Sequence, residues 1–477
     1  MRMKGFLISV LMILGVLGLN LVKTEVEAEA TFNLSAIEFA DQMGVGWNLG
    51  NSLDAYINGI PSETAWGNPV VTQDFIQAIK EAGFTTVRIP VSYMNYIDDR
   101  NHYQINEAWL NRVQEVVDWV VDAGMYAIIN IHHDGNNDYW GGAWLSIEEF
   151  PYENPNWQWS GLDLQLNQHE IQRKFGAVWT QIATRFKDYN ERLIFESGNE
   201  LRELWNYGDP VGRSSMPNLN RLNQLFVDTV RTTGGHNSQR YLLISGYNTN
   251  LWITSSDHLG FQMPRDTVND RLMLSIHYYD PWDFSLNEEN DDVFKWGDEI
   301  HQIGAPHVDS WGHESYVRDA LNELNTKFIS RGVPVIMGEY GSVDKSHVDP
   351  IAHEYRRYYL EYVTRAMVET GGIVPVYWDN GWAGDYGFAL FNRHTGAQIH
   401  EDLVTAIVRA PQHRVRPLFS RQLFEETFAR YANNSPAVRT AYEQALIAAD
   451  RYRNHVSREN LVTVETAYRN LVTLIRS

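Results

Sequence analysis

Apolar runs of strand length alternate with amphipathic segments of helix length along most of this chain. The apolar runs are rich in Ile, Val, Leu and Phe, as buried parallel strands are. They lie at 43–48, 84–90, 125–131, 192–196, 240–245, 271–276, 333–338 and 373–378. Helix-period segments lie between most of them, among them 107–123, 169–187, 218–233, 313–331 and 352–369. Eight strands that alternate with helices predict an α/β fold, a (β/α)8 TIM barrel.

Long loops and a C-terminal extension complete this organisation. The predicted barrel domain, 31–410, exceeds the roughly 250 residues of a typical barrel, so some loops are long, above all 134–166 and 278–312. A linker at 411–420 with two prolines precedes 421–477, which is rich in Arg, Glu and Ala and has a helical period. This predicts a small helical accessory module, which resembles the FIVAR modules of extracellular sugar-active enzymes. Its role, attachment to a polymer or surface versus stability, stays open.

The first 30 residues have the pattern of a secretory signal peptide. Arg2 and Lys4 precede an apolar run at 5–22, and Ala28-Glu29-Ala30 offers a cleavage site with small residues at both ends. We therefore expect a secreted, extracellular protein without a membrane association after signal removal. An uncleaved membrane anchor is the alternative, because the apolar run is long.

Composition narrows the classes of partner. The net charge of −21 speaks against nucleic acid as a partner. The absence of cysteine excludes disulfides and thiolate metal sites. The chain has 16 tryptophans, whose flat rings serve core packing and also stack on the apolar faces of sugars. We expect a monomer that acts on a neutral polysaccharide.

Two glutamates follow buried strands directly. The first is Glu200, at the end of RLIFESGNE (192–200), and the second is Glu339, in VPVIMGEYG (333–341). In a barrel the carboxyl ends of the strands meet at one face, so we expect both side chains in one cleft. Cleavage of a glycosidic bond needs two carboxyl groups, one as acid and the other as nucleophile or base.

Further polar and aromatic residues stand at the ends of the other predicted strands, where they would face the same cleft. They are Asn48, Arg88, His132, His133, Asn199, His277, Tyr279 and Trp378. On a regular strand His132 and His133 point to opposite sides, and we favour His132 for the cleft and leave His133 between the site wall and packing.

Short motifs in the same order connect the chain to a known family. They are GVGWNLG (44–50), ETAWGNP (63–69), VRIPVSY (87–93), INIHHDGN (129–136), NELR (199–202), HYYDPWDF (277–284), GEYG (338–341) and YWDNG (377–381). With them the chain resembles glycoside hydrolase family 5, in the endoglucanase (cellulase) branch that includes xyloglucan-active members. The family's invariant positions fall on Arg88, His132, Asn199, Glu200, His277, Tyr279, Glu339 and Trp378.

The resemblance implies a retaining β-glycanase with defined roles. Glu339 would be the nucleophile, with a pKa lowered by Arg88 and Tyr279, and Glu200 the acid/base, with a raised pKa. Asn199 would bind the sugar 2-hydroxyl, and Trp378 would form the floor under the sugar at the cleaved bond. His132 and His277 would bind sugar hydroxyls there or orient Arg88 and Glu200.

One position departs from the family pattern, since Leu201 stands where proline usually follows the acid/base. We expect this change to alter rate or cleft shape and to preserve activity.

Loop tryptophans are candidates for further sugar contacts. Trp140 is the one we assign to substrate binding, and the others are as consistent with loop packing: Trp144, Trp157, Trp159, Trp282 and Trp382.

No cofactor and no catalytic metal is expected. His132, His133 and Asp134 have no zinc-protease helix motif beside them, and the segment 134–138 lacks the Gly and Glu of a complete calcium loop. The predicted activity is endo-β-1,4-glucanase on cellulose or soluble β-glucan. The alternatives are a xyloglucanase, a mannanase or xylanase, or a carbohydrate-binding protein without catalysis.

Overall fold

The computed structural model describes residues 32–135, 142–147, 168–203, 215–431 and 435–476, and its strands confirm the predicted barrel. Eight parallel strands close in the order β1-β12-β11-β10-β9-β8-β7-β4. Their bounds are β1 (Gly46–Asn48), β4 (Thr86–Ile89), β7 (Tyr126–Ile129), β8 (Leu193–Glu196), β9 (Leu242–Asn250), β10 (Leu272–Tyr278), β11 (Val335–Tyr340) and β12 (Ile373–Tyr377). Each overlaps one of the eight apolar runs, and β9 extends five residues beyond its run.

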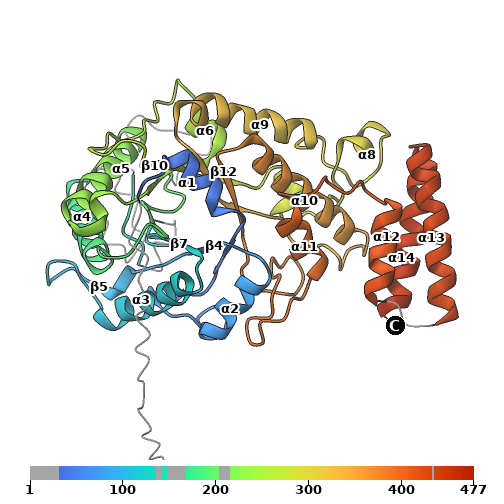
Figure 1. Cartoon of the computed structure of the whole chain (residues 1–477), viewed down its shortest axis with the longest axis horizontal. Coiled ribbons are helices and arrows are strands. Elements are labelled where there is room, and N and C mark those ends of the chain that lie inside the picture. The colour runs from blue at the N-terminus through green and yellow to red at the C-terminus, as the bar shows by residue number, and fades with distance from the viewer. Residues whose placement is uncertain (1–31, 136–141, 148–167, 204–214, 432–434, 477) are drawn as a thin grey trace, which may run out of the picture.

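Helices connect the strands and surround the barrel (Figure 1). The larger ones follow the amphipathic segments: α2 (Gln73–Glu81), α3 (Glu107–Asp122), α4 (Gln168–Arg185), α5 (Ser215–Thr232), α9 (Glu314–Lys327), α10 (Ala352–Thr370) and α11 (Glu401–Arg409). Short helices lie in the connections after β9 and β10: α6 (Leu251–Ser255), α7 (Trp282–Ser285) and α8 (Asp298–Gln302). Polar caps begin several helices; the Thr72 side chain, for example, accepts a hydrogen bond from the Phe75 backbone N–H at the start of α2.

One end of the barrel is closed by helix α1 (Ala36–Met43). Its residues Phe39 and Met43 are buried together with strand side chains that point into the barrel, such as Ile128 and Met273. Phe39 stacks on Tyr241 at 3.7 Å between ring centroids. This plug occupies the amino-terminal end, so the chemistry is left to the carboxyl ends of the strands.

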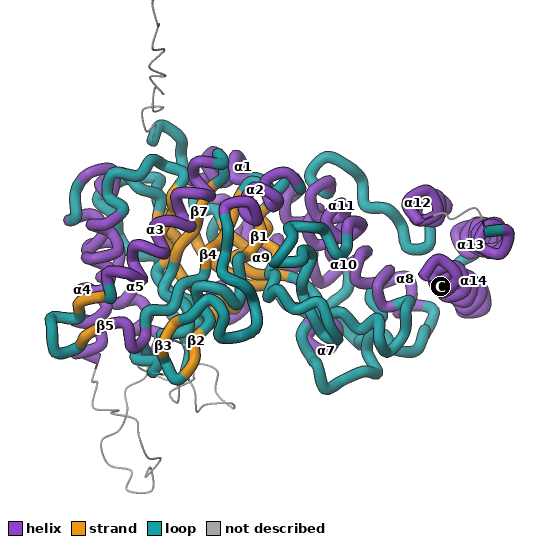
Figure 2. The backbone as a smooth tube through the Cα atoms, turned by 90° about the horizontal axis from the view of Figure 1, so that it is seen from below, coloured by secondary structure: helices purple, strands orange, loops and turns teal. Residues whose placement is uncertain are grey.

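The opposite end carries the long loops. Two small antiparallel hairpins lie in them, β2 (Tyr56–Ile57) with β3 (Ile60–Pro61) and β5 (Ile97–Asp98) with β6 (Gln104–Ile105). Figure 2 shows α1 at one end of the molecule, and the hairpin β2–β3 and α7 at the other. The predicted site residues that the structure describes lie in the last parts of the barrel strands or in the loops that follow them at that end.

The C-terminal segment forms three helices, α12 (Arg421–Tyr431), α13 (Pro436–Asn454) and α14 (Arg458–Arg476). They stand together at one side of the barrel, near α8, α10 and α11 (Figure 1). A buried ion pair joins Lys295 of the barrel to Glu465 of α14 at 2.8 Å, and the Tyr355 hydroxyl donates to the same carboxylate at 2.7 Å. Phe419, in the predicted linker, is fully buried. The three helices therefore share one hydrophobic core with the barrel.

None of the helices in the described part of the chain combines the length and apolar character that a bilayer span requires.

Candidate active site

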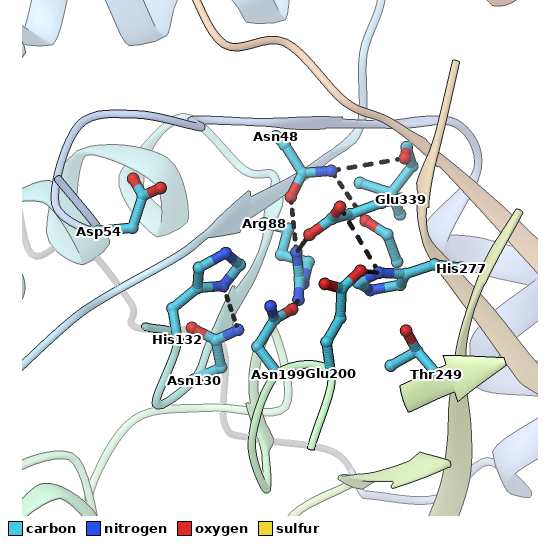
Figure 3. Close-up of polar contacts among 12 residues, drawn as sticks. Asn48, Asp54, Arg88, Asn130, His132, Asn199, Glu200, Thr249, His277 and Glu339 are labelled. Atoms are coloured by element: carbon cyan, nitrogen blue, oxygen red, sulfur yellow. Dashed lines mark hydrogen bonds and ion pairs between the residues drawn. The ribbon is translucent and has the colours of Figure 1, made fainter. Parts of the chain in front are cut away.

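The two glutamates reach the same space from two strands of the barrel that β9 and β10 separate (Figure 3). Glu339 lies within β11, and Glu200 lies four residues beyond the end of β8. One ring nitrogen of His277, on β10, lies 2.8 Å from a Glu200 oxygen and 3.5 Å from a Glu339 oxygen. The closed barrel thus brings together two carboxyl groups that are 139 positions apart in the chain.

Arg88 is the centre of the polar network below these glutamates. Its guanidinium is fully buried and donates to four side-chain oxygens: Asn48 Oδ1 (3.0 Å), Glu196 Oε2 (2.8 Å), Asn199 Oδ1 (2.7 Å) and Glu339 Oε1 (2.8 Å). Burial opposes its charge, but Glu196 and Glu339 outweigh that effect and raise the pKa of Arg88 above its usual value. Arg88 is therefore a permanent cation that orients Glu339 and Asn199.

Glu339 is held at both oxygens. Arg88 donates to one, and the Tyr279 hydroxyl donates to the other at 3.0 Å. Only 7% of the Glu339 side chain is exposed. Burial, followed by the negative charge of Glu339, raises the pKa of Tyr279 well above its usual value, so this hydroxyl keeps its proton and stays a donor.

Glu200 is more open, with one third of its side chain exposed. Its backbone has a left-handed conformation with φ 47°, which is unusual for a residue other than glycine. The next residue, Leu201, is buried against Gly135 and Gly198. Its carbonyl accepts a hydrogen bond from Asn248 N–H at 2.8 Å. Leu201 thus anchors the loop that presents Glu200.

The pKa values of the two carboxyl groups are displaced in opposite directions, and both directions differ from those expected from the sequence. Burial raises the pKa of Glu339 and outweighs the attraction of His277 and Arg88. Burial also opposes ionisation of Glu200, but its hydrogen bond and charge attraction with His277, together with the charges of Arg202 and Arg88, outweigh burial and lower its pKa. The expectation was wrong for Glu339 because burial outweighs the attraction of Arg88, and wrong for Glu200 because the attraction of His277 and of nearby arginines outweighs burial.

The two histidines after β7 lie side by side. The strand ends at Ile129, so strand alternation does not separate His132 from His133, and their rings are 4.6 Å apart. His132 is buried, lies parallel to Trp378 at 6.1 Å, and has a pKa lowered well below its usual value by burial and then by His133. It is therefore a neutral hydrogen-bonding group.

His133 faces a second group of residues along the rim. Its Nε2 lies 3.4 Å from a carboxylate oxygen of Asp54, and its ring lies near those of Tyr56 and Trp66. This places His133 at a wall next to the catalytic pair.

Three buried polar residues of the network do not stand among the predicted site residues. Glu196 accepts hydrogen bonds from Arg88, from Asn130 Nδ2 at 3.0 Å and from Ser275 Oγ at 2.6 Å. Asn130 also contacts His132 Nδ1 at 3.1 Å. A carboxylate inside an otherwise apolar strand was the available signal for Glu196, since a buried charge needs a partner.

The candidate loop tryptophans divide into three groups. Trp140, Trp157 and Trp159 lie outside the described residues. Trp144 is buried, and its indole N–H donates to Asp134 at 2.6 Å, so it holds its own loop. Trp282 and Trp382 are exposed, at 56% and 61%.

Within the described residues, three groups bring possible metal ligands within 4.8 Å of one another: Glu200, His277 and Glu339; Asp54, His132 and His133; His353, His400 and Asp402. The first is the carboxylate pair itself. Asp134, the first residue of the incomplete calcium loop, accepts backbone hydrogen bonds from Tyr93 and Met94. The rest of that loop, from 136 on, is not described.

The chain is similar to known glycoside hydrolases. The family model for cellulases, glycosyl hydrolase family 5, matches residues 51–384. Endoglucanase A of Paenibacillus barcinonensis is 43% identical over 397 residues, which cover 82% of this chain and 93% of that protein. A xyloglucan-specific endo-β-1,4-glucanase of Bacteroides ovatus is 36% identical, over 79% of this chain and 70% of that protein.

Solved structures of family 5 enzymes are also similar to this chain. A family 5 xyloglucanase from Paenibacillus pabuli superposes with a TM-score of 0.71 at 43% identity, over 78% of this chain and all of that one. A broad-specificity endoglucanase from Bacteroides salanitronis reaches 0.70 at 38% identity, over 80% of this chain and 96% of that one.

Proposed function

Since the chain belongs to glycoside hydrolase family 5 and is an endoglucanase by its homologues, we propose that it is a secreted endo-β-1,4-glucanase that cleaves cellulose or soluble β-glucans with retention of configuration. One observation carries the mechanism: oxygens of Glu200 and Glu339 and a nitrogen of His277 lie within 4.8 Å of one another. Retaining enzymes separate their carboxyl groups by about 5–5.5 Å, whereas inverting enzymes leave about 6.5–9.5 Å for a water molecule.

In the first step, ionised Glu339 attacks the anomeric carbon while protonated Glu200 gives its proton to the leaving oxygen. The pKa directions of the free protein favour the opposite placement of the proton, so substrate binding has to shift the shared proton to Glu200. Arg88 and Tyr279 hold the attacking carboxylate by one hydrogen bond to each oxygen. Asn199, fixed by Arg88 through its Oδ1, has its amide N–H group available for the sugar 2-hydroxyl. The product is a covalent glycosyl-enzyme.

In the second step, Glu200 accepts a proton from water, which attacks the anomeric carbon and releases Glu339. Glu200, His277 and Glu339 are close enough to titrate as one unit. Bonding of the sugar to Glu339 removes its negative charge, which lowers the pKa of Glu200 further and suits its role as base.

Xyloglucan is the second candidate substrate. It is favoured by the likeness to a xyloglucan-specific endoglucanase and to a xyloglucanase structure. Mannan and xylan remain the other candidates within the family, whereas the likeness to endoglucanases across the barrel leaves the non-catalytic alternative without support.

The proposal is tested by hydrolysis of barley β-glucan, carboxymethylcellulose, xyloglucan, mannan and xylan by the mature protein. We expect activity on a glucan, loss of it in Glu339→Gln, and full activity in Glu369→Gln, an exposed control. Proton NMR of the first product should show the β-anomer. Release of the α-anomer would contradict retention, and activity on mannan or xylan alone would contradict the substrate.

Rescue of activity by azide distinguishes the acid/base from the nucleophile. Glu200→Gln should lower polymer hydrolysis by about 10²–10⁴-fold but retain attack on a substrate with an activated leaving group. Azide should then rescue turnover and give a β-glycosyl azide. An α-glycosyl azide from this variant would reverse the assignment of nucleophile and acid/base.

Secretion and the monomeric state have their own tests. N-terminal sequencing of the protein recovered from culture medium should begin directly after Ala30. Retention of the protein in the membrane fraction would indicate the uncleaved anchor instead. Light scattering of the mature protein should give the mass of one chain.

A further inference from the structure

Three tryptophans expose much of their rings on one side of the barrel mouth. Trp252 is 40% exposed, Trp311 is 41% exposed and Trp282 is 56% exposed. They come from α6, from the loop before α9 and from the start of α7, so residues distant in the chain gather here. Exposed aromatic side chains that cluster in this way mark a binding surface more often than scattered ones do.

Hydrogen bonds fix the orientation of this cluster. The Trp252 indole N–H donates to the Tyr316 hydroxyl at 2.6 Å, and that hydroxyl donates to Asp280 Oδ2 at 3.0 Å. The Trp311 ring meets the Tyr316 ring edge-on at 5.0 Å. The rings are therefore held in place, which lowers the entropy lost when a ligand binds.

The Trp311 loop is fastened to the barrel as well. Gly312 has φ 81°, and a Cβ at this position would lie 2.7 Å from Pro281. Its carbonyl accepts a hydrogen bond from the buried indole of Trp296 at 2.8 Å. Only glycine permits this close approach, which brings Trp311 next to the segment that begins with Asp280 and continues to Trp282.

This cluster is continuous with the catalytic pair. Asp280 directly follows Tyr279, whose hydroxyl binds Glu339. His277 pairs with Asn250 across β10 and β9, and Trp252 follows two residues later. A chain bound at the two glutamates therefore needs little further length to reach the rings.

Different residues lie on the two sides of the catalytic pair. In Figure 3, Asn48, Arg88 and His132 lie to one side of Glu200, and His277 and Thr249 lie to the other. The first side also carries Trp378, whose ring is parallel to that of His132. If Trp378 lies under the sugar that Glu339 attacks, as the family resemblance implies, the leaving part of the substrate lies over the second side, on β9 and β10.

We propose that Trp252, Trp311 and Tyr316 form an aglycone platform, which stacks on the sugar rings of the β-glucan on the leaving-group side of the cleaved bond. The inference rests on the proposed function and adds to it the residues that select polymeric over short substrates. Flat aromatic rings suit the apolar faces of β-linked pyranoses. Binding energy from such remote sugars is available to the transition state.

The test compares substrates with and without sugars on the leaving-group side. Trp252→Ala and Trp311→Ala should lower kcat/KM on β-glucan about tenfold, the factor that corresponds to ~1.4 kcal/mol. Hydrolysis of β-cellobiosyl fluoride, whose leaving group is too small to reach the platform, should stay within about twofold of wild type, since the variants keep every contact on the other side.

Transfer to an added sugar gives a second readout. Cellobiose added with the fluoride occupies the leaving-group side of the glycosyl-enzyme, so the wild type should form cellotetraose. Both alanine variants should form less of it at equal fluoride consumption. Tyr316→Phe keeps the ring but loses both hydrogen bonds, and its loss should be intermediate. Ile447→Ala, an exposed apolar change on α13, should match wild type.

Three outcomes would overturn the platform. Equal losses on polymer and fluoride would indicate a structural role, which the melting temperature would also reveal. Unchanged polymer kinetics and transfer would place the surface outside the substrate path. A dimer that dissociates in Trp252→Ala while the kinetics stay unchanged would identify a subunit contact.

Failure of the proposed function is distinguishable from failure of the platform. If the wild type cleaves no β-glucan, binding of cellohexaose to Glu339→Gln by calorimetry still tests the surface. Weaker cellohexaose binding by the double variant Glu339→Gln with Trp252→Ala than by Glu339→Gln alone supports the platform. Equal binding by the two variants, or no binding by either, rejects it.

Discussion

At the residue scale, the charge balance around Arg88 decides the properties of the nucleophile. One guanidinium serves two buried carboxylates, Glu196 through Nε and Glu339 through Nη1. Glu196 touches no reacting atom, so it is a positioning residue that acts through Arg88. Its charge takes up part of the attraction that Arg88 would otherwise direct to Glu339.

Glu196→Gln should therefore change the pH profile as well as the rate. The amide is isosteric and can keep the bonds from Arg88 and Asn130 while donating to Ser275. With one anion removed, Arg88 stabilises the Glu339 carboxylate more strongly and lowers its raised pKa. We expect the acid limb of kcat/KM to move to lower pH, by up to about one unit, or ~1.4 kcal/mol. A loss of activity with an unmoved acid limb would indicate that Glu196 serves packing alone.

The position of the acid/base Glu200 also depends on its neighbour in the chain, Leu201. Proline, which usually stands here in the family, disfavours helical conformations in the residue before it and favours extended backbone. Glu200 has φ 47°, so leucine is compatible with its left-handed backbone. The leucine that departs from the family pattern thus permits the left-handed backbone of the acid/base, which a proline at position 201 would disfavour.

Leu201→Pro should displace Glu200 and lower kcat on polymer. A misplacement of about 1 Å costs on the order of 10²-fold in rate. Leu201→Met, which conserves volume, should keep the activity of wild type within a few-fold. Crystal structures or Glu200-dependent azide rescue would report the displacement, and unchanged kinetics in Leu201→Pro would contradict this coupling.

At the element scale, the two ends of the barrel have different roles: one end is packed for stability, and the other carries the catalytic residues. Helix α1 fills the amino-terminal end with Phe39 and Met43, while the strands end in catalytic residues at the other. Ser35 and Glu38 form reciprocal hydrogen bonds at the start of α1, which fixes where the plug begins.

A change in the plug should therefore affect unfolding and spare catalysis. Phe39 is 1% exposed, and Phe39→Ala should lower the free energy of unfolding by about 3–5 kcal/mol because it leaves a cavity beside Tyr241. Gln42→Ala, on the exposed face of the same helix, should change it by less than ~0.5 kcal/mol. Urea titration gives the stability, and a large fall in kcat/KM of folded Phe39→Ala would contradict the separation.

At the scale of the whole molecule, the C-terminal helices are joined to the barrel by a seam of paired charges. A cavity of about 300 Å³ lies in this seam, lined by residues of α10, α11, α12 and α14. His353 Nε2 contacts Asp402 at 2.6 Å, and His400 lies 3.7 Å from Asp344. Arg356 also faces these groups.

The two histidines should give stability a maximum near pH 6.5. Burial and then the charge of His353 lower the pKa of His400 to about 3, so its contribution is lost as pH falls below 6.5, where the unfolded chain gains a proton first. Burial opposes the charge of His353, but Asp402 outweighs it and raises that pKa. Its contribution is complete below 6.5 and is lost as pH rises through the raised value.

Urea unfolding between pH 5 and 8 checks this expectation. Each histidine changes the free energy of unfolding by at most ~1.4 kcal/mol per pH unit over its range. His400→Gln should flatten the acid side of the curve and His353→Gln the alkaline side. The same curvature in wild type and both variants would show that other groups set the pH dependence.

The sequence by itself determined the order of strands and helices, because burial on both faces gives parallel strands their apolar runs and a single buried face gives helices their period. It also determined that Glu200 and Glu339 stand at strand ends. The shared cleft followed from the predicted barrel, but only the tertiary structure decided which of its groups touch, since barrel closure brings the carboxyl ends of β4, β8, β10 and β11 to one rim across long stretches of chain. That is why the contacts of Arg88 with Glu196 and Asn199, the place of His277 between the carboxylates, and the cluster around Tyr316 were not predictable. Distance and burial set pKa values, and both are properties of the packed molecule.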